Sequence, residues 1–353
     1  MTQVPGLDQA GLTRWLEREH PELAAGPLTA TLMPGGRSNL TYRVDGARIP
    51  LVVRRPPLGH VLSSAHDMAR EHRVISALRA SQVPVPRVVD LVDDTEAGAV
   101  TGTVFFVMEH VSGAVLARPE LNAGWTPEAL RGLSLHLAEV LADLHTLDPA
   151  AVGLGGFGRP DGYLARQLRT WRRQYDASRS RELPALDRLQ DRLGDLLPEQ
   201  NPRAAVVHGD YRLDNVIVTA PSAPSVAPRV AAVIDWEMAT LGDPLVDLGM
   251  LAMYWEIAEL TADHGRAVSA VVPGAGYPGL DELVDAYAAR ARVAAPELSW
   301  YRAFATYKLA VILEGIHYRF RAGETVGDGF DTIGDLVLPL AEDGLARIAT
   351  RRS

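Results

Sequence analysis

A polar loop between two apolar stretches carries the side chains with the clearest chemical potential in this sequence. The loop follows an apolar stretch that ends at residue 207, and Asn215 comes five positions after Asp210. A carboxylate in a rigid loop can accept a proton from a hydroxyl group, and an amide oxygen one turn later can bind Mg²⁺. We therefore take Asp210 as a candidate catalytic base and Asn215 as a candidate metal ligand.

A second carboxylate, Asp235, closes a β-branched stretch twenty positions after Asn215. An aspartate at the end of a strand can hold Mg²⁺ against nucleotide phosphates, because Mg²⁺ prefers carboxylate oxygen and keeps its other positions for phosphate and water. A lone aspartate in a loop is more often a turn or capping residue. The joint spacing of Asp210, Asn215 and Asp235 nevertheless favours a catalytic role over that interpretation.

Other polar residues near this loop have less specific interpretations. We expect His208 to order the loop by hydrogen bonding rather than to act as an acid or base. Arg212 and Asp214 are expected to pair with the loop backbone or with each other, and a contact of Arg212 with an anionic substrate remains open. His145, at the end of an expected helix, is interpreted as a packed capping residue.

The elements that must position these residues fall into two groups. Residues 28–110 have the pattern of a small antiparallel sheet, and a polar helix is expected before them, at residues 1–23. The strands are expected at 28–33, 41–44, 49–54, 87–92 and 104–111, with one helix at 67–80. Later helices are expected at 126–145, 160–180, 184–197, 244–260, 280–294, 298–322 and 331–349, around one β segment at 204–234 that an exposed tip at 220–228 divides.

The third expected strand ends in Arg54, where a cation could hold nucleotide phosphates through two donors. On the helix at 67–80, Glu71 shares one face with apolar residues at helical spacing. A carboxylate on an apolar stripe is costly unless it is paired, so we expect Glu71 to pair with Arg54. The alternative is a partly exposed glutamate at the edge of the stripe. Arg55 is interpreted as a solvated arginine at the strand end.

Two further segments are candidate nucleotide contacts. Between the first two strands lies Gly35-Gly36-Arg37-Ser38-Asn39, where backbone amides could approach phosphates, although two glycines in a hairpin are more often only a turn. The strand at 104–111 ends before a Ser-Gly break, and we expect the main chain of Glu109 and Val111 to contact adenine. That stretch is equally compatible with a plain buried strand.

Composition restricts the classes of function. The chain has 353 residues and a net charge of −9, which argues against nucleic acid as the main partner. It has no cysteine, so disulfides, thiol nucleophiles and Cys-ligated zinc are excluded, and we expect a cytoplasmic protein. We expect neither a signal peptide nor a transmembrane helix. Lys308 is the only lysine, so arginine must do the work that lysine usually does, and no P-loop is expected.

The motif His208-Gly209-Asp210-x-x-x-x-Asn215, followed by Ile234-Asp235 and Asp243-x-x-x-Asp247, resembles the aminoglycoside phosphotransferase and choline kinase family. The glycine segment at 35–40 and the sequence Arg-Arg-Pro-Pro at 54–57 further resemble a subgroup that occurs alone in bacteria or fused to acyl-CoA dehydrogenases. The resemblance implies Asp210 as catalytic base, Asn215 and Asp235 as Mg²⁺ ligands, and Asp247 as an anchor of the catalytic loop. Arg54 departs from the lysine that is common in the family.

The resemblance implies an α+β, two-lobed, protein-kinase-like fold. Residues 1–110 would form the N-lobe, with the nucleotide-binding sheet, and residues 111–353 a larger, mainly helical C-lobe. The chain would use ATP and Mg²⁺ to phosphorylate a hydroxyl of a small molecule, and the subgroup points to a hydroxy acid or hydroxyacyl-CoA. The alternatives are an aminoglycoside kinase and a non-catalytic nucleotide-binding pseudokinase. Contacts of Arg319 or Arg321 with the substrate, the choice of ATP over GTP and the oligomeric state stay open.

Overall fold

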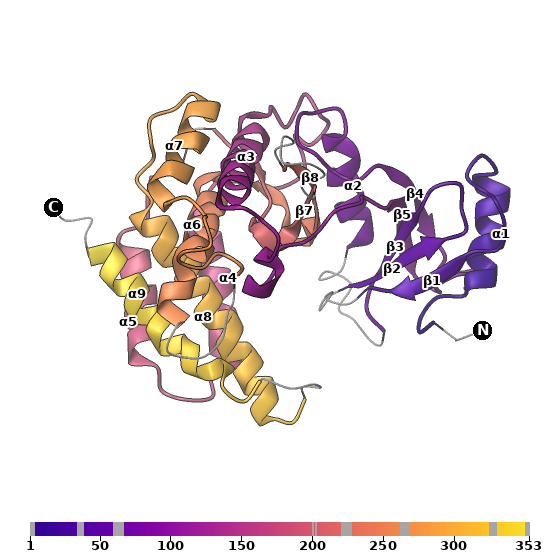
Figure 1. Cartoon of the computed structure of the whole chain (residues 1–353). Helices are drawn as coiled ribbons and strands as arrows, with labels where there is room; N and C mark the ends of the chain where they lie inside the picture. The colour runs from indigo at the N-terminus through magenta and orange to yellow at the C-terminus, as the bar shows by residue number, and fades with distance from the viewer. Residues whose placement is uncertain are drawn as a thin grey trace. The chain divides into compact units, whose positions relative to one another are not determined.

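The computed structural model describes residues 4–33, 39–58, 67–199, 201, 203–219, 228–261, 269–324 and 330–349. The chain forms two compact units, the first comprising Met1–Gly113 with Ala231–Ala239, and the second comprising Ala114–Val230 with Thr240–Ser353. An antiparallel sheet dominates the first unit and helices dominate the second (Figure 1), so the predicted α+β class is confirmed. The predicted glycine-rich contacts Gly35, Gly36, Arg37 and Ser38, and most of the expected tip at 220–228, lie outside the described residues.

A five-stranded antiparallel sheet organises the first unit, in the order β1-β2-β3-β5-β4. Its strands are β1 (Thr29–Leu32), β2 (Leu40–Asp45), β3 (Leu51–Arg55), β4 (Val88–Asp93) and β5 (Val104–Glu109). The helices of this unit are α1 (Gln9–Glu19) and α2 (Met68–Leu78). Both helices begin at an aspartate whose side chain accepts backbone N–H bonds, and α1 is shorter than the sequence pattern predicted because Asp8 caps it.

The two faces of this sheet have different tasks. Every second residue of a strand points to the same face, and on one face Val53 and Phe105 form a buried core with Trp15 of α1. The residues between them, which include Arg54 and Phe106, therefore point to the opposite face. On that face, His72 of α2 contacts the Phe106 ring. Helix α2 packs on β4 and β5, so the strand pleat directs Arg54 toward the helix that carries Glu71.

Arg55 is buried, and its interpretation as a solvated strand-end residue is wrong. It is 4% exposed, because the next position in the pleat turns its side chain toward the α1 side of the sheet. Its guanidinium donates to the carbonyl oxygens of Pro56, Gly6 and Thr101. Burying an arginine is tolerable here because backbone oxygens satisfy its donors.

Asp94, just after β4, organises the turn that leads into β5. Its carboxylate accepts hydrogen bonds from the backbone N–H groups of residues 99–102 at 2.6–2.9 Å. Burial alone would raise the pKa of Asp94, but these four N–H donors outweigh burial and lower it. The charged carboxylate thus stabilises this part of the folded first unit.

The second unit is mainly helical and is built around α8. Its helices are α3 (Pro127–Thr146), α4 (Tyr163–Ser178), α5 (Pro184–Asp195), α6 (Leu245–Thr261), α7 (Leu280–Ala291), α8 (Ser299–Arg321) and α9 (Val337–Ala349). Helix α8 packs against α4, α5, α6 and α9 and is buried along most of its length. The single helix expected at 331–349 is instead a 3₁₀ turn, Ile333–Leu336, followed by α9.

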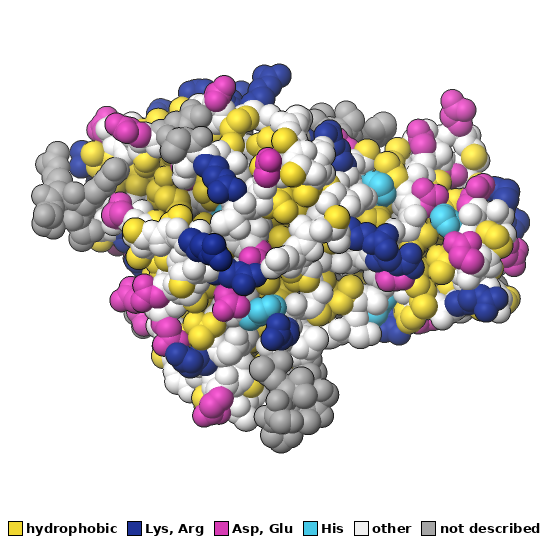
Figure 2. All heavy atoms as spheres, turned by 90° about the horizontal axis from the view of Figure 1, so that it is seen from above, with side chains coloured by type: hydrophobic (Ala, Val, Ile, Leu, Met, Phe, Trp, Pro, Cys, Tyr) yellow, Lys and Arg dark blue, Asp and Glu magenta, His cyan; other side chains and the backbone are white. Residues whose placement is uncertain are grey.

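Short strands and 3₁₀ turns hold the loops that carry the candidate residues. Strands β6 (Ala205–Val207) and β9 (Thr240–Gly242) pair antiparallel, and β7 spans Val216–Val218 and β8 spans Val230–Val233. Besides Ile333–Leu336, the described residues form 3₁₀ turns at Pro119–Asn122, Leu213–Asn215 and Trp236–Met238. Within the described part of the chain, no helix is both long enough and apolar enough to span a membrane. Acidic and basic side chains are interspersed on the face shown in Figure 2.

Candidate active site

The predicted pair of Arg54 and Glu71 is present. Arg54 Nε donates to Glu71 Oε2 at 2.9 Å, and the two side chains are 12% and 2% exposed. Burial alone would lower the pKa of Arg54, but the carboxylates of Glu71 and Asp235 outweigh it and raise that pKa. Burial raises the pKa of Glu71, and Arg54 partly offsets this increase. The guanidinium therefore stays charged in an environment that is poorly screened by water.

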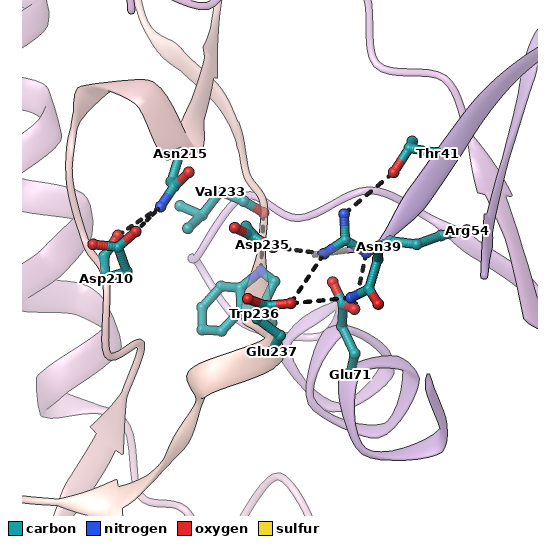
Figure 3. A network of polar contacts seen from close by, with 10 residues as sticks. All are labelled: Asn39, Thr41, Arg54, Glu71, Asp210, Asn215, Val233, Asp235, Trp236 and Glu237. Carbon is teal, nitrogen blue, oxygen red and sulfur yellow. Dashed lines mark hydrogen bonds and ion pairs between the residues drawn. The ribbon is translucent and has the colours of Figure 1, made fainter. Parts of the chain in front are cut away.

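Asp235 belongs to the same network (Figure 3). Arg54 Nη2 donates to Asp235 Oδ1 at 2.5 Å, so one guanidinium joins the helix glutamate and the candidate metal ligand. Asp235 has φ = 66°, and apart from Arg292 it is the only non-glycine residue with positive φ in the described ranges. Such a backbone persists only where the surroundings enforce it, and it is frequent at functional sites.

The segment around Asp235 is fixed to the first unit by its neighbours. The fully buried Trp236 donates from its indole to the Val233 carbonyl oxygen at 3.0 Å, and the turn that begins with Trp236 packs against α2. Val233 N–H also donates to the Pro84 carbonyl oxygen at 2.8 Å. These contacts explain why residues 231–239 belong to a compact unit that is otherwise formed by the N-terminal part of the chain.

Two members of this network were missed by sequence reasoning. Glu237 Oε2 lies 4.0 Å from Arg54 Nη2 and accepts a hydrogen bond from Asn39 Nδ2 at 3.0 Å. Thr41 Oγ1 accepts from Arg54 Nη1 at 3.3 Å. Asn39, predicted as a nucleotide contact, is 1% exposed and so orders this acidic cluster. The sequence feature that could have indicated Glu237 is its position, two residues after the candidate metal ligand Asp235.

The loop around Asp210 is anchored by Asp247 at the start of α6. Its carboxylate, which is fully buried, accepts from the backbone N–H groups of His208 at 2.6 Å and Gly209 at 2.8 Å. Burial alone would raise the pKa of Asp247, but His145, His208 and the loop N–H groups lower it. The anchoring role that the resemblance implied for Asp247 is therefore confirmed.

His145 extends this anchor, which corrects its interpretation as a capping residue. Its Nε2 lies 3.3 Å from Asp247 Oδ2, and its Nδ1 lies 2.9 Å from the Tyr287 hydroxyl oxygen. The side chain is buried between α3 and α7, two helices that pack together. The histidine ring thus forms hydrogen bonds with both the Asp247 carboxylate and the Tyr287 hydroxyl. A capping residue would instead bond to backbone groups at the end of α3.

Asp210 and Asn215 lie together in the loop (Figure 3). Asn215 Nδ2 donates to the Asp210 carbonyl oxygen at 2.8 Å and to Asp210 Oδ2 at 2.9 Å. Asp210 N–H donates to His208 Nδ1 at 3.2 Å, which agrees with the loop-ordering role expected for His208. Because the amide nitrogen of Asn215 donates to Asp210, the amide oxygen points away from Asp210.

Asn215 and Asp235 are the two residues that the sequence predicts as Mg²⁺ ligands. Asn215 offers an amide oxygen and Asp235 a carboxylate that is 34% exposed. Within the described residues, no group of three His, Asp or Glu side chains could enclose a metal by itself. Mg²⁺ usually takes one or two protein ligands at such sites and completes its shell with substrate phosphate and water. Asn215 and Asp235 therefore each supply an oxygen ligand of a kind that Mg²⁺ binds beside nucleotide phosphate.

Arg212 and Asp214 pair with each other, as one of the two expectations had it. Arg212 Nη1 lies 3.3 Å from Asp214 Oδ2, and Arg212 Nε lies 3.5 Å from Asp210 Oδ2. The guanidinium also lies over the Tyr254 ring of α6, 4.5 Å from its centroid. Burial raises the pKa of Asp214 to about 6, although Arg212 opposes this. A guanidinium is thus held in a defined orientation beside the candidate base.

The remaining predicted residues lie at the end of β5 and in the last turn of α8. The N–H of Glu109 donates to the Arg87 carbonyl oxygen at 2.8 Å, and the Glu109 carboxylate pairs with the Arg87 side chain. Val111 follows β5 and is half-buried. Arg319 and Arg321 are exposed in the last turn of α8. In all, the first unit brings together Asn39, Arg54, Glu71 and Asp235, and the second brings together Asp210 and Asn215.

Comparison with known proteins identifies the family. Residues 29–304 match the model of the phosphotransferase enzyme family, so the chain belongs to that family and the predicted resemblance is confirmed. A solved structure from Ralstonia eutropha JMP134, provisionally named an aminoglycoside phosphotransferase, is 33% identical with a TM-score of 0.81. The match covers 98% of this chain and 99% of that one.

Two other comparisons concern the length of the relatives and the fold. Acyl-CoA dehydrogenase family member 11 of Gallus gallus is 34% identical over 96% of this chain, which corresponds to 43% of the relative. The chain therefore spans less than half the length of that protein. The GDP complex of aminoglycoside 2′-phosphotransferase-IIIa covers 98% of this chain and 99% of that one, with a TM-score of 0.58 and 15% identity, and shows a shared fold.

Proposed function

We propose that this protein is an ATP-dependent kinase that transfers the γ-phosphoryl group to a hydroxyl of a small molecule. The observation that carries the proposal is the Asp210 loop, in which Asn215 holds the candidate base and Asp247 holds the backbone before it. Membership in the phosphotransferase enzyme family supports the reaction class. A pseudokinase would be expected to lack part of this machinery, whereas here the base and both candidate metal ligands are present.

Each residue has a definite task in this proposal. Asp210 would orient the acceptor hydroxyl and take its proton, while Asn215 and Asp235 would hold Mg²⁺. Arg54 would steady the α- and β-phosphates, and Glu71 would hold Arg54 in place. Bound Mg²⁺ would neutralise charge that develops on the phosphate oxygens. Most of the rate enhancement of such an enzyme comes from positioning and electrostatic stabilisation, which suits rigid, buried ion pairs.

Adenine recognition through the main chain of Glu109 and Val111 is part of the proposal. The N–H of Glu109 donates to the Arg87 carbonyl oxygen, so we assign the carbonyl oxygen of Glu109 to adenine. Val111 lies two residues further on, beyond the end of β5. A carbonyl acceptor and an amide donor at this spacing could pair with the edge of a purine. These two main-chain groups would not by themselves distinguish ATP from GTP.

The acceptor is proposed to be a hydroxy acid or a hydroxyacyl-CoA. Arg212 lies 3.5 Å from Asp210, so a hydroxyl bound to Asp210 would lie near a guanidinium. We propose that this guanidinium would also bind an anionic group of the acceptor, beside the carboxylates of Asp210 and Asp214 with which it pairs. The names of the similar proteins, which include acyl-CoA dehydrogenase family members, support the same choice.

The test is a screen for phosphoryl transfer. Purified protein is incubated with ATP and Mg²⁺ and with hydroxy acids, hydroxyacyl-CoA esters and aminoglycosides, and products are identified by a mass increase of one phosphate. We expect ADP to form in step with a phosphorylated hydroxy acid or hydroxyacyl-CoA. Phosphorylation of aminoglycosides alone would contradict the acceptor assignment, and ATP binding without transfer to any acceptor would favour a pseudokinase.

A further inference from the structure

Lys308 is the only lysine among 35 lysine and arginine residues of the chain. A chain that otherwise uses arginine throughout has kept an ammonium group at this one position. The residue lies in the middle of α8, the central helix of the second unit, and is 4% exposed. Burying a charged group is costly unless strong partners compensate it, so its partners indicate its purpose.

Lys308 contacts the backbone of the candidate catalytic loop. Lys308 Nζ donates to the Gly209 carbonyl oxygen at 2.6 Å, a short bond from a charged donor. The ammonium also lies 5.2 Å from the centroid of the Trp171 ring of α4. Burial lowers the pKa of Lys308, while the charges of Asp210 and Asp247 oppose that shift. The cation thus lies close enough to Asp210 for the two charges to interact.

Gly209 is held on both sides. Its N–H donates to Asp247, its carbonyl oxygen accepts from Lys308, and its φ of 90° is a conformation that side chains other than hydrogen rarely allow. The carbonyl of Gly209 and the N–H of Asp210 belong to one planar peptide group. A bond that fixes this carbonyl therefore fixes the plane from which the Asp210 side chain extends.

The choice of lysine over arginine follows from this geometry. A single carbonyl oxygen in a buried site needs a compact donor, and an ammonium on a flexible stem supplies one. A guanidinium is larger and planar, with five donors in a fixed fork, and so fits this position on α8 less closely than a compact ammonium does. We propose that Lys308 is a positioning residue that holds Asp210 in its catalytic orientation through the Gly209 carbonyl.

This inference rests on the proposed function for its effect on turnover, but its structural part can be tested without activity. Lys308→Met keeps the length of the side chain and removes the donor. Hydrogen–deuterium exchange should show faster exchange in the loop 206–216, which includes the N–H groups of His208 and Gly209, with other segments unchanged. Thr306→Val, a buried change on the same helix, serves as the control and should leave the loop unchanged.

Turnover and rescue complete the experiment. With a phosphorylated acceptor in hand, Lys308→Met should lower kcat about 10²-fold, as expected for a misplaced reacting group, and leave the KM for ATP within about twofold. Because the chain has no cysteine, Lys308→Cys can be alkylated with bromoethylamine while unfolded and then refolded, beside wild-type protein treated identically. The restored ammonium should recover at least half of the lost loop protection, whereas Lys308→Arg should not.

The outcomes separate the two proposals. Unchanged exchange in the loop of Lys308→Met would overturn the inference, as would faster exchange throughout the protein, which indicates a general structural role. Local loosening of the loop in a protein that phosphorylates no acceptor would leave the positioning role standing and count against the proposed function. A fall in kcat that alkylated Lys308→Cys fails to reverse would show that the ammonium is not the relevant group.

Discussion

Glu71→Ala removes the carboxylate that holds the Arg54 guanidinium against α2. The pair is buried, with side-chain exposures of 2% and 12%, so water screens it weakly. Removing one partner of a buried pair typically costs about 3–5 kcal/mol when the other charge is left alone. Here Asp235 remains 2.5 Å from Arg54 Nη2, so we expect a smaller coupling of about 1–3 kcal/mol. Without Glu71, the Arg54 guanidinium would still pair with Asp235, the candidate metal ligand.

The assay is calorimetric titration of ATP with Mg²⁺ into wild type, Glu71→Ala, Arg54→Ala and the double variant. Each single change should weaken binding, and the double variant should be weakened by less than the sum. Arg54→Lys should retain more affinity than Arg54→Ala, because the charge survives although the two-donor fork is lost. Arg43, an exposed arginine of β2 that pairs with Asp45, supplies the control. Arg43→Ala and Glu71→Ala should be additive within about 0.5 kcal/mol. Additivity of the Arg54 and Glu71 changes would refute the reasoning and leave Glu71 as an ordinary acid.

Three further predictions follow from the same structure. ATP with Mg²⁺ should raise the melting temperature of the protein, because a ligand that binds only the folded state stabilises it; no shift at millimolar concentration would count against nucleotide binding. Asp235→Asn should lose turnover and recover part of it at high Mg²⁺, since a charged metal ligand is weakened rather than removed; full turnover at low Mg²⁺ would exclude Asp235 as a ligand. Asp94→Asn should lower the free energy of unfolding of the first unit by about 1.5–3 kcal/mol at pH 7. Because the folded-state pKa of Asp94 is lowered, its contribution is present above about pH 4 and is lost as the pH falls below that value. Urea unfolding at pH 7 and pH 3.5, with exposed Glu96→Gln as the control, would detect this, and an equal loss at both values would contradict it.

Local patterns were sufficient to predict much of the fold. The antiparallel sheet, α2 and most later helices follow from apolar periodicity and from aspartate caps or prolines at the first turns. The pair of Arg54 and Glu71 was predictable because a carboxylate on an apolar helix face requires a nearby cation. The prediction for Arg55 was wrong because the strand pleat that turns Arg54 toward α2 turns Arg55 toward the other face of the sheet. The carbonyl oxygens that accept its hydrogen bonds there belong to loops distant in the sequence.

The parts that could not be predicted depend on contacts between distant segments. Asp235 lies 181 positions from Arg54 in the sequence, and its neighbour Glu237 has no local feature that marks it as a partner of Asn39. The bond from Lys308 to Gly209 spans 99 positions. For Lys308 the composition gave a signal, since an isolated lysine in an arginine-rich chain is unusual. That signal could not indicate which carbonyl oxygen the ammonium would meet.

The base assignment is the central claim of this account, and Asp210→Asn tests it most directly. The variant keeps the shape of the side chain but cannot take a proton from the acceptor. Single-turnover kinetics with a verified acceptor, alongside ATP titration, should show nucleotide affinity within about twofold of wild type and turnover lowered about 10²–10⁴-fold, the usual range for a general base. Added Mg²⁺ should restore none of it. If Asp210→Asn retains full turnover, Asp210 only shapes the loop and the catalytic assignment is wrong.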